Sequence, residues 1–312
     1  MEYLLLIIGF VLLVKGADFF VDGASSIAAK LKVPSLIIGL TVVSIGTSLP
    51  EAAVSISASL SGNNGISLGN VIGSNIFNLL MVVGVSSTIL PIITDRDILK
   101  RDMPINIVIT AILCAMLLDG TLSRLDAAIL LLLLATYMFI LIRSAIKNRA
   151  EADETKVLSW TKSVIFTVLG AAAIIFGGDM VVDNATIIAT NLGMGETLVG
   201  LTIVAIGTSL PELVTSIIAA KKGDSGIAMG NVMGSNIFNI LFILGMAGVI
   251  QPMHADAAFF IDAGILICIA ILMFVFAFTK RKISRVEGAI SVLLYVAYTA
   301  YIIMRAFHIW IF

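Results

Sequence analysis

Two glutamates stand inside long apolar segments of this sequence, each preceded by hydroxyl residues and a proline. Glu51 ends the stretch GLTVVSIGTSLPE, and Glu212 ends the stretch GLTIVAIGTSLPE. An ionised carboxylate in hydrocarbon is costly, so intramembrane acids usually face a polar pathway or a binding site. Residues 34–60 and 195–219, which surround the two glutamates, contain no lysine or arginine that could pair with them. The sequence therefore predicts that both carboxylates bind a cation.

Hydroxyl groups and loosened backbone carbonyls are expected beside each glutamate. Thr47, Ser48 and Glu51 stand at i, i+1 and i+4, which places them on one helical face. Pro50 lacks an N–H and clashes with the carbonyl four residues back, so we expect a kink that leaves one or more of the carbonyls at 44–46 without an intrahelical partner. Such carbonyls are tolerated at membrane depth where they line a cavity or meet a ligand. The second stretch repeats the pattern at Thr208, Ser209, Pro211 and Glu212, with carbonyls near 205–207.

A second motif supplies further oxygen ligands for an opposing wall. It reads GISLGNVIGSNIFNLL at residues 65–80 and GIAMGNVMGSNIFNIL at residues 226–241. Its glycines form a small-xxx-small face that lets helices approach closely. Asn75 and Asn236 fit either interhelical hydrogen bonds or the site itself. Hydroxyl and amide side chains one helical turn apart are expected to line the site at Ser74, Asn78, Ser235 and Asn239.

The predicted site contains carboxylate, hydroxyl, amide and carbonyl oxygens, without thiols or imidazoles. Such ligands suit hard cations, and six to eight flexible oxygens suit Ca²⁺ better than Mg²⁺. Two negative charges balance one divalent ion or two monovalent ions, so Ca²⁺ and Na⁺ can compete for the same oxygens. His254 and His308 fall at the ends of apolar segments, and we expect neither to bind metal.

Both motifs belong to a tandem duplication. The first pair is identical at eleven of thirteen positions and the second at twelve of sixteen, and both pairs share an offset of 161 residues. The same offset maps Asp18 onto Asp179 and Asp22 onto Asp183. Internal repeats of this kind indicate that each copy is one structural unit.

The elements that hold these motifs are predicted to be transmembrane helices. The chain is 59% hydrophobic and 12% charged, whereas a soluble domain carries about 25% charged residues. A bilayer core needs about 20 apolar helical residues per crossing. We expect about ten spans in an all-α membrane protein, near 3–24, 34–60, 65–90, 104–118, 124–143, 161–184, 195–219, 226–250, 258–278 and 287–310.

Charge placement predicts the orientation of these spans. The loops after the odd-numbered spans carry sixteen lysines and arginines, and those on the other side carry two. The positive-inside rule then places the basic loops in the cytoplasm and both termini outside the cell, in the plasma membrane. The net charge of −1 gives no indication of a nucleic-acid partner, and no obligatory protein partner is indicated.

Five spans per copy would place the second copy upside down in the membrane. We expect a first five-helix repeat at 1–144, a cytoplasmic linker at 145–160 and a second, inverted repeat at 161–312. Inverted repeats are typical of secondary transporters, whose substrate site lies near the membrane midplane.

The GTSLPE and GNVIGSNIFN motifs resemble those of the cation/calcium antiporter superfamily, and most closely its prokaryotic sodium/calcium exchanger branch. The resemblance covers the whole chain and implies a ten-helix antiporter, with spans one and six sliding across a central core. It implies Ca²⁺ binding by Glu51, Glu212, Thr47 and Thr208. It also implies Na⁺ binding by the two glutamates with Ser48, Ser74, Ser209, Ser235 and the backbone carbonyls of Ser44 and Ala205.

One departure leaves the coupling ion open. Related proteins often have aspartate at one of the positions of Asn78 and Asn239, and here both are asparagine. Exchange of Na⁺ for Ca²⁺ is the leading hypothesis, and antiport of H⁺ against Ca²⁺ or another divalent cation is the alternative. A passive channel is disfavoured because the glutamates form a pair rather than a ring. An enzyme is disfavoured because no histidine or lysine base lies near Ser48 in the sequence, and no cofactor is expected.

Overall fold

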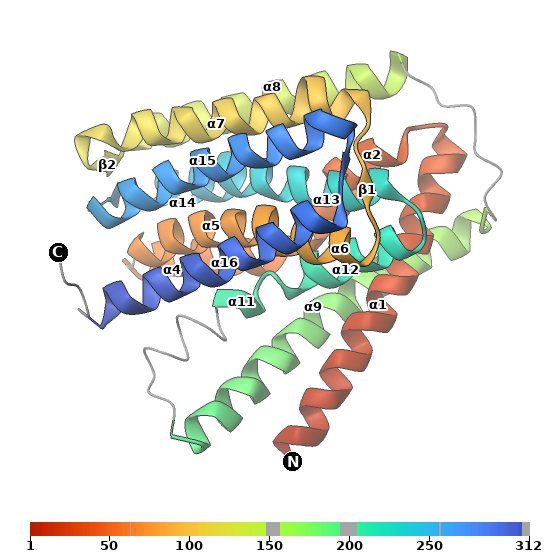
Figure 1. Ribbon diagram of the computed structural model, residues 1–312, viewed down its shortest axis with the longest axis horizontal. Coiled ribbons are helices and arrows are strands. Elements are labelled where there is room, and N and C mark those ends of the chain that lie inside the picture. The colour runs from red at the N-terminus through yellow and green to blue at the C-terminus, as the bar shows by residue number, and fades with distance from the viewer. Residues whose placement is uncertain (63, 148–156, 194–204, 256, 308–312) are drawn as a thin grey trace.

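The protein is almost entirely helical in a computed structural model, which describes all residues except 63, 148–156, 194–204, 256 and 308–312 (Figure 1). The first half contains α1 (Glu2–Leu31), α2 (Ser35–Ile38), α3 (Ser44–Thr47), α4 (Leu49–Leu60), α5 (Asn64–Phe77), α6 (Val83–Ile89), α7 (Met103–Met116) and α8 (Arg124–Lys147). The second half contains α9 (Trp160–Asn191), α11 (Ala205–Gly207), α12 (Leu210–Lys221), α13 (Ser225–Phe238), α14 (Gly245–Ile250), α15 (Ala257–Lys280) and α16 (Arg285–Ala306).

Short π-helical and 3₁₀ turns join several of these helices. The π-helical turns are η1 (Gly39–Val43), η2 (Asn78–Val82), η3 (Ile98–Asp102) and η6 (Asn239–Leu244), and the 3₁₀ turn is η4 (Leu117–Asp119). Two of the π-helical turns, η2 and η6, begin at the asparagines that the sequence places in the site. Because π-helical turns inside α-helices frequently occur at functional sites, their position agrees with that assignment.

The helices are long and apolar enough for a multi-pass membrane protein. Among the described residues, eight unbroken helices could cross a bilayer, and the bent pair Ser35–Thr47 and Leu49–Leu60 makes a ninth. The predicted span 195–219 is only partly described, because 194–204 lie outside the described residues; α11 and α12 follow. Each predicted span is therefore helical over most of its described residues.

Helices α1 and α9 lie side by side and run obliquely across the rest of the bundle (Figure 1). Glycines let their backbones touch. A methyl group added at Gly170 would lie 2.6 Å from the backbone nitrogen of Phe20 and 2.8 Å from the carbonyl oxygen of Gly16. The two helices have 30 and 32 residues and extend well beyond the predicted 3–24 and 161–184.

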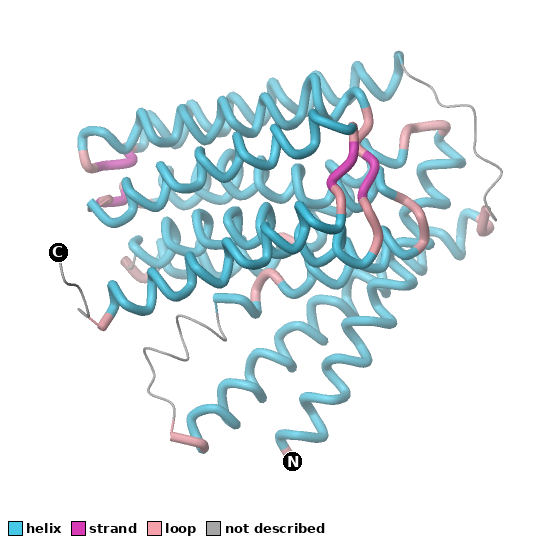
Figure 2. Tube along the Cα trace, in the orientation of Figure 1, coloured by secondary structure: helices cyan, strands magenta, loops and turns pink. Residues whose placement is uncertain are grey.

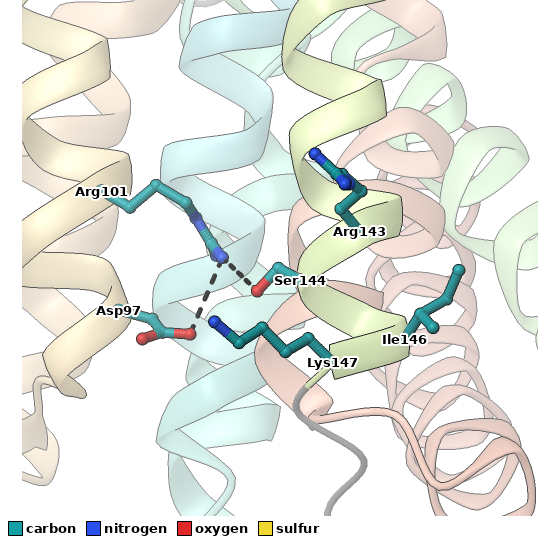
Figure 3. Close-up of a pocket in the computed structure, with 6 residues that line it drawn as sticks. All are labelled: Asp97, Arg101, Arg143, Ser144, Ile146 and Lys147. Atoms are coloured by element: carbon teal, nitrogen blue, oxygen red, sulfur yellow. Dashed lines mark hydrogen bonds and ion pairs between the residues drawn. The ribbon is translucent and has the colours of Figure 1, made fainter.

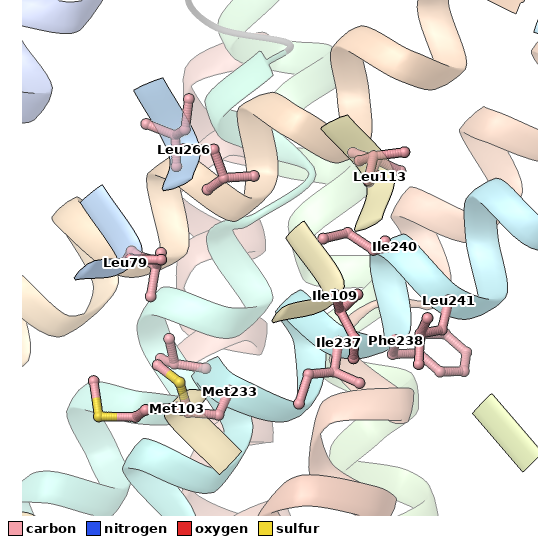
Figure 4. Packing of buried hydrophobic residues seen from close by; sticks show 14 of the residues in the cluster. Leu79, Met103, Ile109, Leu113, Met233, Ile237, Phe238, Ile240, Leu241 and Leu266 are labelled. Atoms are coloured by element: carbon pink, nitrogen blue, oxygen red, sulfur yellow. The ribbon is translucent and has the colours of Figure 1, made fainter. Parts of the chain in front are cut away.

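The centre of the molecule is formed by the helices that carry the second motif. About three quarters of the apolar windows of Gly65–Ile89 and Ser225–Ile250 are buried, against 11–39% in the other unbroken spans. Buried side chains of this central region, such as Ile237 of α13 and Ile240 of η6, belong to one apolar cluster with Leu113 of α7 and Leu266 of α15 (Figure 4). The repeated motif therefore lies in the protein interior rather than against lipid.

Two short antiparallel strand pairs tie the halves together. Strand β1 (Ile92–Ile93) pairs with β4 (Lys282–Ile283), and β2 (Thr121–Leu122) pairs with β3 (Met253–His254). Each pairing is the counterpart of the other at the 161-residue offset, and Figure 2 places the two pairs at opposite ends of the bundle. The side chain of His254 is exposed in β3, and His308 lies outside the described residues.

The turns obey the same offset. All residues with positive φ in the described chain form three matched pairs, namely Lys32 with Gly193, Gly62 with Gly223, and Gly120 with Arg281. A left-handed residue ends a helix by reversing the chain direction. The duplication seen in the sequence is therefore also present in the backbone.

Candidate functional site

Both glutamates lie in the first turn of a helix that begins at a break. The chain bends by 49° between Thr47 and Leu49, and α4 then begins with Pro50 in its first turn and Glu51 directly after it. Glu212 occupies the same position in α12, after Pro211. The kink predicted at Pro50 is confirmed. A helix N-terminus carries partial positive charge, so it favours an ionised carboxylate at this position.

Each glutamate accepts a hydrogen bond from a serine of the other half of the molecule. Ser48 Oγ donates to Glu212 Oε1 at 2.8 Å, and Ser209 Oγ donates to Glu51 Oε1 at 3.0 Å. All four side chains are inaccessible to solvent. The structure thus pairs each glutamate with a serine more than 150 positions away in the sequence.

A set of unpartnered oxygens surrounds these bonds. Buried polar groups normally have hydrogen-bond partners, and an unpaired one is costly. Eleven buried side-chain polar atoms in the described chain have none, and six of them belong to predicted site residues. These six are Glu51 Oε2, Glu212 Oε2, Ser74 Oγ, Asn78 Oδ1, Asn239 Oδ1 and Thr208 Oγ1. All six are oxygens, which is the ligand type that Ca²⁺ and Na⁺ require.

Four asparagines form a network between α5 and α13. Asn75 Nδ2 donates to the carbonyl of Asn236 at 3.1 Å, and Asn236 Nδ2 donates to that of Asn75 at 3.4 Å. Asn78 Nδ2 donates to Asn236 Oδ1, and Asn239 Nδ2 donates to Asn75 Oδ1. The interhelical interpretation of Asn75 and Asn236 is confirmed. Because the network uses the amide nitrogens of Asn78 and Asn239, their amide oxygens remain available to a cation.

The backbone at Ser44 lies one turn before the helix break. Its carbonyl keeps an intrahelical partner, since it accepts the N–H of Ser48 at 3.0 Å. It also accepts hydroxyl hydrogen bonds from Thr47 at 3.3 Å and Ser235 at 3.5 Å. Of the three carbonyls at 44–46, one or more of which were expected to be unpaired, that of Ser44 is therefore paired, because the helix breaks one turn later, at Ser48. Ala205, its counterpart, begins α11.

Two further asparagines, Asn70 and Asn231, contact the site and were not singled out from the sequence. Asn70 Nδ2 donates to the carbonyl of Glu51 at 3.2 Å and to Ser55 Oγ at 2.9 Å. Asn231 Nδ2 donates to the carbonyl of Glu212 at 3.3 Å and to Ser216 Oγ at 3.0 Å. Each is the asparagine of the GNV sequence in its copy of the second motif, and this repetition was the signal that could have revealed them.

A cavity of about 270 Å³ reaches one side of the site. It is lined by Pro50, Val54, Gly207, Thr208 and Pro211, and by residues of α9 that include Asp179 and Asp183. A second cavity, of about 720 Å³, lies between η3 and the end of α8 and contains none of the predicted site residues (Figure 3). There Arg101 binds Ser144 at 2.7 Å and lies 3.7 Å from Asp97.

No lysine or arginine of the described residues forms a salt bridge with the two glutamates of the site. The salt bridges of the described residues all lie away from the two glutamates, for example between Arg305 and Asp262 or between Arg101 and Asp102. Two buried carboxylates with no cationic partner are costly unless they are protonated or bind cations. The arrangement can therefore hold one divalent ion or two monovalent ions.

Comparison with known proteins identifies the family. The family model described as sodium/calcium exchanger protein matches residues 1–143 and 162–304. The sodium/calcium exchanger MaX1 of Methanosarcina acetivorans is 36% identical, with 95% of this chain and 97% of the relative covered. The inner membrane protein YrbG of Escherichia coli is 39% identical, with 86% of each chain covered.

A solved structure agrees with the sequence relatives. The sodium-calcium exchanger NCX_Mj, soaked with Na⁺ and Sr²⁺, is 34% identical and superposes with a TM-score of 0.85 over 96% of this chain and 97% of that chain. The chain therefore belongs to the sodium/calcium exchanger family, as a multi-pass membrane antiporter of cations that include Ca²⁺.

Proposed function

We propose that this protein exchanges Na⁺ for Ca²⁺ by alternating access to the site between Glu51 and Glu212. The observation that carries the proposal is the reciprocal Ser48–Glu212 and Ser209–Glu51 pairing, which leaves one oxygen of each carboxylate without a partner. Bound Ca²⁺ neutralises both charges, and so do two Na⁺ ions. Each ion therefore competes with the other at the same oxygens.

The proposed ligand set is the one that the family resemblance implies, and the oxygens without partners at the site support it. Ca²⁺ is bound by the two glutamates with Thr47 and Thr208. Na⁺ uses the glutamates with Ser48, Ser74, Ser209 and Ser235, and with the backbone carbonyls of Ser44 and Ala205. Asn78 and Asn239 turn amide oxygens toward the ions. In support, the similar protein NCX_Mj is a sodium-calcium exchanger in which occlusion of the binding site is induced.

The proposed topology is ten spans in two inverted repeats, 1–144 and 161–312, joined by a cytoplasmic linker. The matched strand pairs at opposite ends of the bundle support inversion, because a parallel repeat would place them at the same end (Figure 2). In this topology the site lies near the membrane midplane. Both termini face the outside of the plasma membrane, in keeping with the distribution of lysine and arginine.

Antiport of H⁺ against Ca²⁺ is the competing function. It is favoured by one observation, that Asn78 and Asn239 leave the site with no more than two formal charges. Protonation of the two glutamates would release Ca²⁺ as effectively as two Na⁺ ions would.

The deciding experiment measures Ca²⁺ uptake into proteoliposomes loaded with Na⁺, with and without an imposed pH gradient, while the membrane potential is clamped. We expect uptake that requires internal Na⁺ and is indifferent to the pH gradient. Ca²⁺ uptake into proteoliposomes that contain the Glu51→Gln variant measures the passive leak of Ca²⁺, which is subtracted from the uptake by the parent protein. Uptake driven by internal acid in the absence of Na⁺ would replace the proposal with H⁺/Ca²⁺ antiport.

A further inference from the structure

The two halves of the site hold their threonines differently. Thr47 Oγ1 donates to Asn231 Oδ1 at 2.9 Å, the shortest of its three hydrogen-bond contacts. At the 161-residue offset, the counterparts of these residues are Thr208 and Asn70. Thr208 Oγ1 is buried without a partner, so the counterpart bond is not made. One threonine–asparagine pair is therefore closed and the other is open.

Asn231 connects the two halves at the site. Its amide nitrogen binds the Glu212 carbonyl and Ser216, both in α12, and its amide oxygen receives the hydroxyl of Thr47 from α3. The side chain is fully buried, whereas Asn70 is partly exposed. Asn231 thus fixes the glutamate of one copy and the broken helix of the other in a single arrangement.

Packing around the closed pair is tight. A methyl group added at Gly230 would lie 2.7 Å from the carbonyl oxygen of Leu36, and one added at Gly234 would lie 2.5 Å from Ser44 Oγ. The segment from α2 to α3 is therefore seated directly on α13. The open pair instead borders the 270 Å³ cavity, which Thr208 lines.

At the positions equivalent to the wall of the open cavity, an ion pair joins the end of α12 to α1. Lys222, which follows α12, lies 2.7 Å from Asp18 Oδ1 and also pairs with Asp22, both in α1. The counterpart of Lys222 is Ser61, which cannot bind the counterparts of these aspartates as a cation. Those counterparts, Asp179 and Asp183, line the open cavity.

We propose that Asn70 and Asn231 are positioning residues that alternate: Asn231 holds Thr47 while the Lys222 side is closed, and Asn70 takes the hydroxyl of Thr208 when the opposite side closes. The proposal rests on the alternating access proposed above. It assigns to each asparagine a bond that exists in only one of the two states. The bonds of each asparagine to its neighbouring glutamate carbonyl and serine are expected in both states, so removing one asparagine shifts the equilibrium through the loss of its threonine bond in one of them.

Matched reporters can measure the two states. Val54 lines the open cavity, and its counterpart Thr215 is fully buried on the closed side. Each is replaced by cysteine in a protein whose Cys114 and Cys268 have been changed to serine. Reaction with a water-soluble maleimide is then followed in buffer without Na⁺ or Ca²⁺, so that labelling does not depend on ion binding.

We expect Asn231→Leu to raise the labelling rate at Thr215→Cys about 5-fold, the population change that the loss of one net hydrogen bond produces. Asn70→Leu should lower that rate about 5-fold, because it destabilises the minor state in which Thr215 is accessible. The double variant should return toward the parent rate. Equal effects of the two single variants, or no effect of either, would overturn the proposal.

Variants of the threonines guard against misfolding of the asparagine variants. Thr47→Val removes the same bond as Asn231→Leu but keeps the Asn231 contacts to Glu212 and Ser216, and it should also speed labelling at Thr215→Cys. Thr208→Val should slow it. A melting temperature measured for each variant separates loss of fold from a shift of state. If Thr215→Cys reacts in none of these variants, the proposal of alternating access itself is contradicted. Equal labelling rates in the Asn70→Leu and Asn231→Leu variants would contradict only the alternation of the two asparagines.

Discussion

At the scale of single residues, each glutamate depends on the other half of the molecule. Glu51 receives its hydrogen bond from Ser209, and Glu212 receives its bond from Ser48. Each carboxylate uses Oε1 in this bond and presents Oε2 to the site. An ion that bridges the two Oε2 atoms therefore binds both repeats at once, which couples ion binding to their relative position.

Neutralising either glutamate should abolish exchange without unfolding the protein. Glutamine keeps an amide oxygen that can accept from the serine, but it removes one of the two charges that hold Ca²⁺. We expect Glu51→Gln and Glu212→Gln each to reduce Ca²⁺ uptake by about 100-fold, since a charged ligand is worth about 3 kcal/mol. Glu2→Gln, at an exposed position, is the matched control and should transport normally. Normal uptake by either site variant would disprove the assignment.

The sequence pointed to these proposed ligand positions because the motifs occur twice in segments without balancing cations. It could not predict which oxygens remain unpaired, since that depends on partners such as Ser48 and Glu212 that are 164 residues apart. It also overlooked Asn231, because an asparagine in a glycine-rich motif gives no indication of which backbone carbonyl it meets. Nor could the sequence tell which carbonyl before Pro50 keeps its partner: that of Ser44 does, because the helix breaks one turn later, at Ser48.

At the scale of helices, the sequence located most spans well but underestimated α1 and α9. Hydropathy marks the part of a helix that crosses hydrocarbon, and tilted helices extend beyond it. The predicted 3–24 and 161–184 became Glu2–Leu31 and Trp160–Asn191. The broken helix at Ser48 was predictable from Pro50. The π-helical turns at Asn78 and Asn239 were not, because they arise from packing of the motif helices in the core.

The contact between α1 and α9 should tolerate no side chain at its crossing point. A methyl group at Gly170 meets backbone atoms of Phe20 and Gly16, which belong to a helix and cannot move aside as a side chain can. We expect Gly170→Ala to lower stability by about 1–3 kcal/mol through overpacking, measured as a lower melting temperature in detergent.

Gly264→Ala is the control for that substitution. It lies within α15, and no atom of the described residues would approach its new methyl group within 4 Å. Removing a helical glycine there should leave stability unchanged or raise it by up to about 1 kcal/mol. A melting temperature for Gly170→Ala at or above that of Gly264→Ala would contradict direct backbone packing of α1 on α9.

At the scale of the whole molecule, the duplication is present in strands, turns and site, yet the two halves are not in equivalent states. The strand pairs and the positive-φ residues match at the 161-residue offset. The Thr47–Asn231 bond and the Lys222 ion pairs have no such counterparts among the described residues. A transporter built from two equal halves must break this equivalence to open toward one side only. The exchange of roles between the halves then gives the opposite state.

Inversion of the repeats makes one prediction that needs no transport. Leu31 is the last residue of α1, and its counterpart Leu192 follows α9; both side chains are exposed. In intact cells, with Cys114 and Cys268 replaced by serine, a membrane-impermeant maleimide should label Leu192→Cys. It should label Leu31→Cys only after the membrane is permeabilised. The two positions are equivalent in the repeat, so labelling of both from the same side would require parallel rather than inverted copies. In parallel copies the two helix breaks would have the same orientation, and the site could not lie between oppositely oriented breaks.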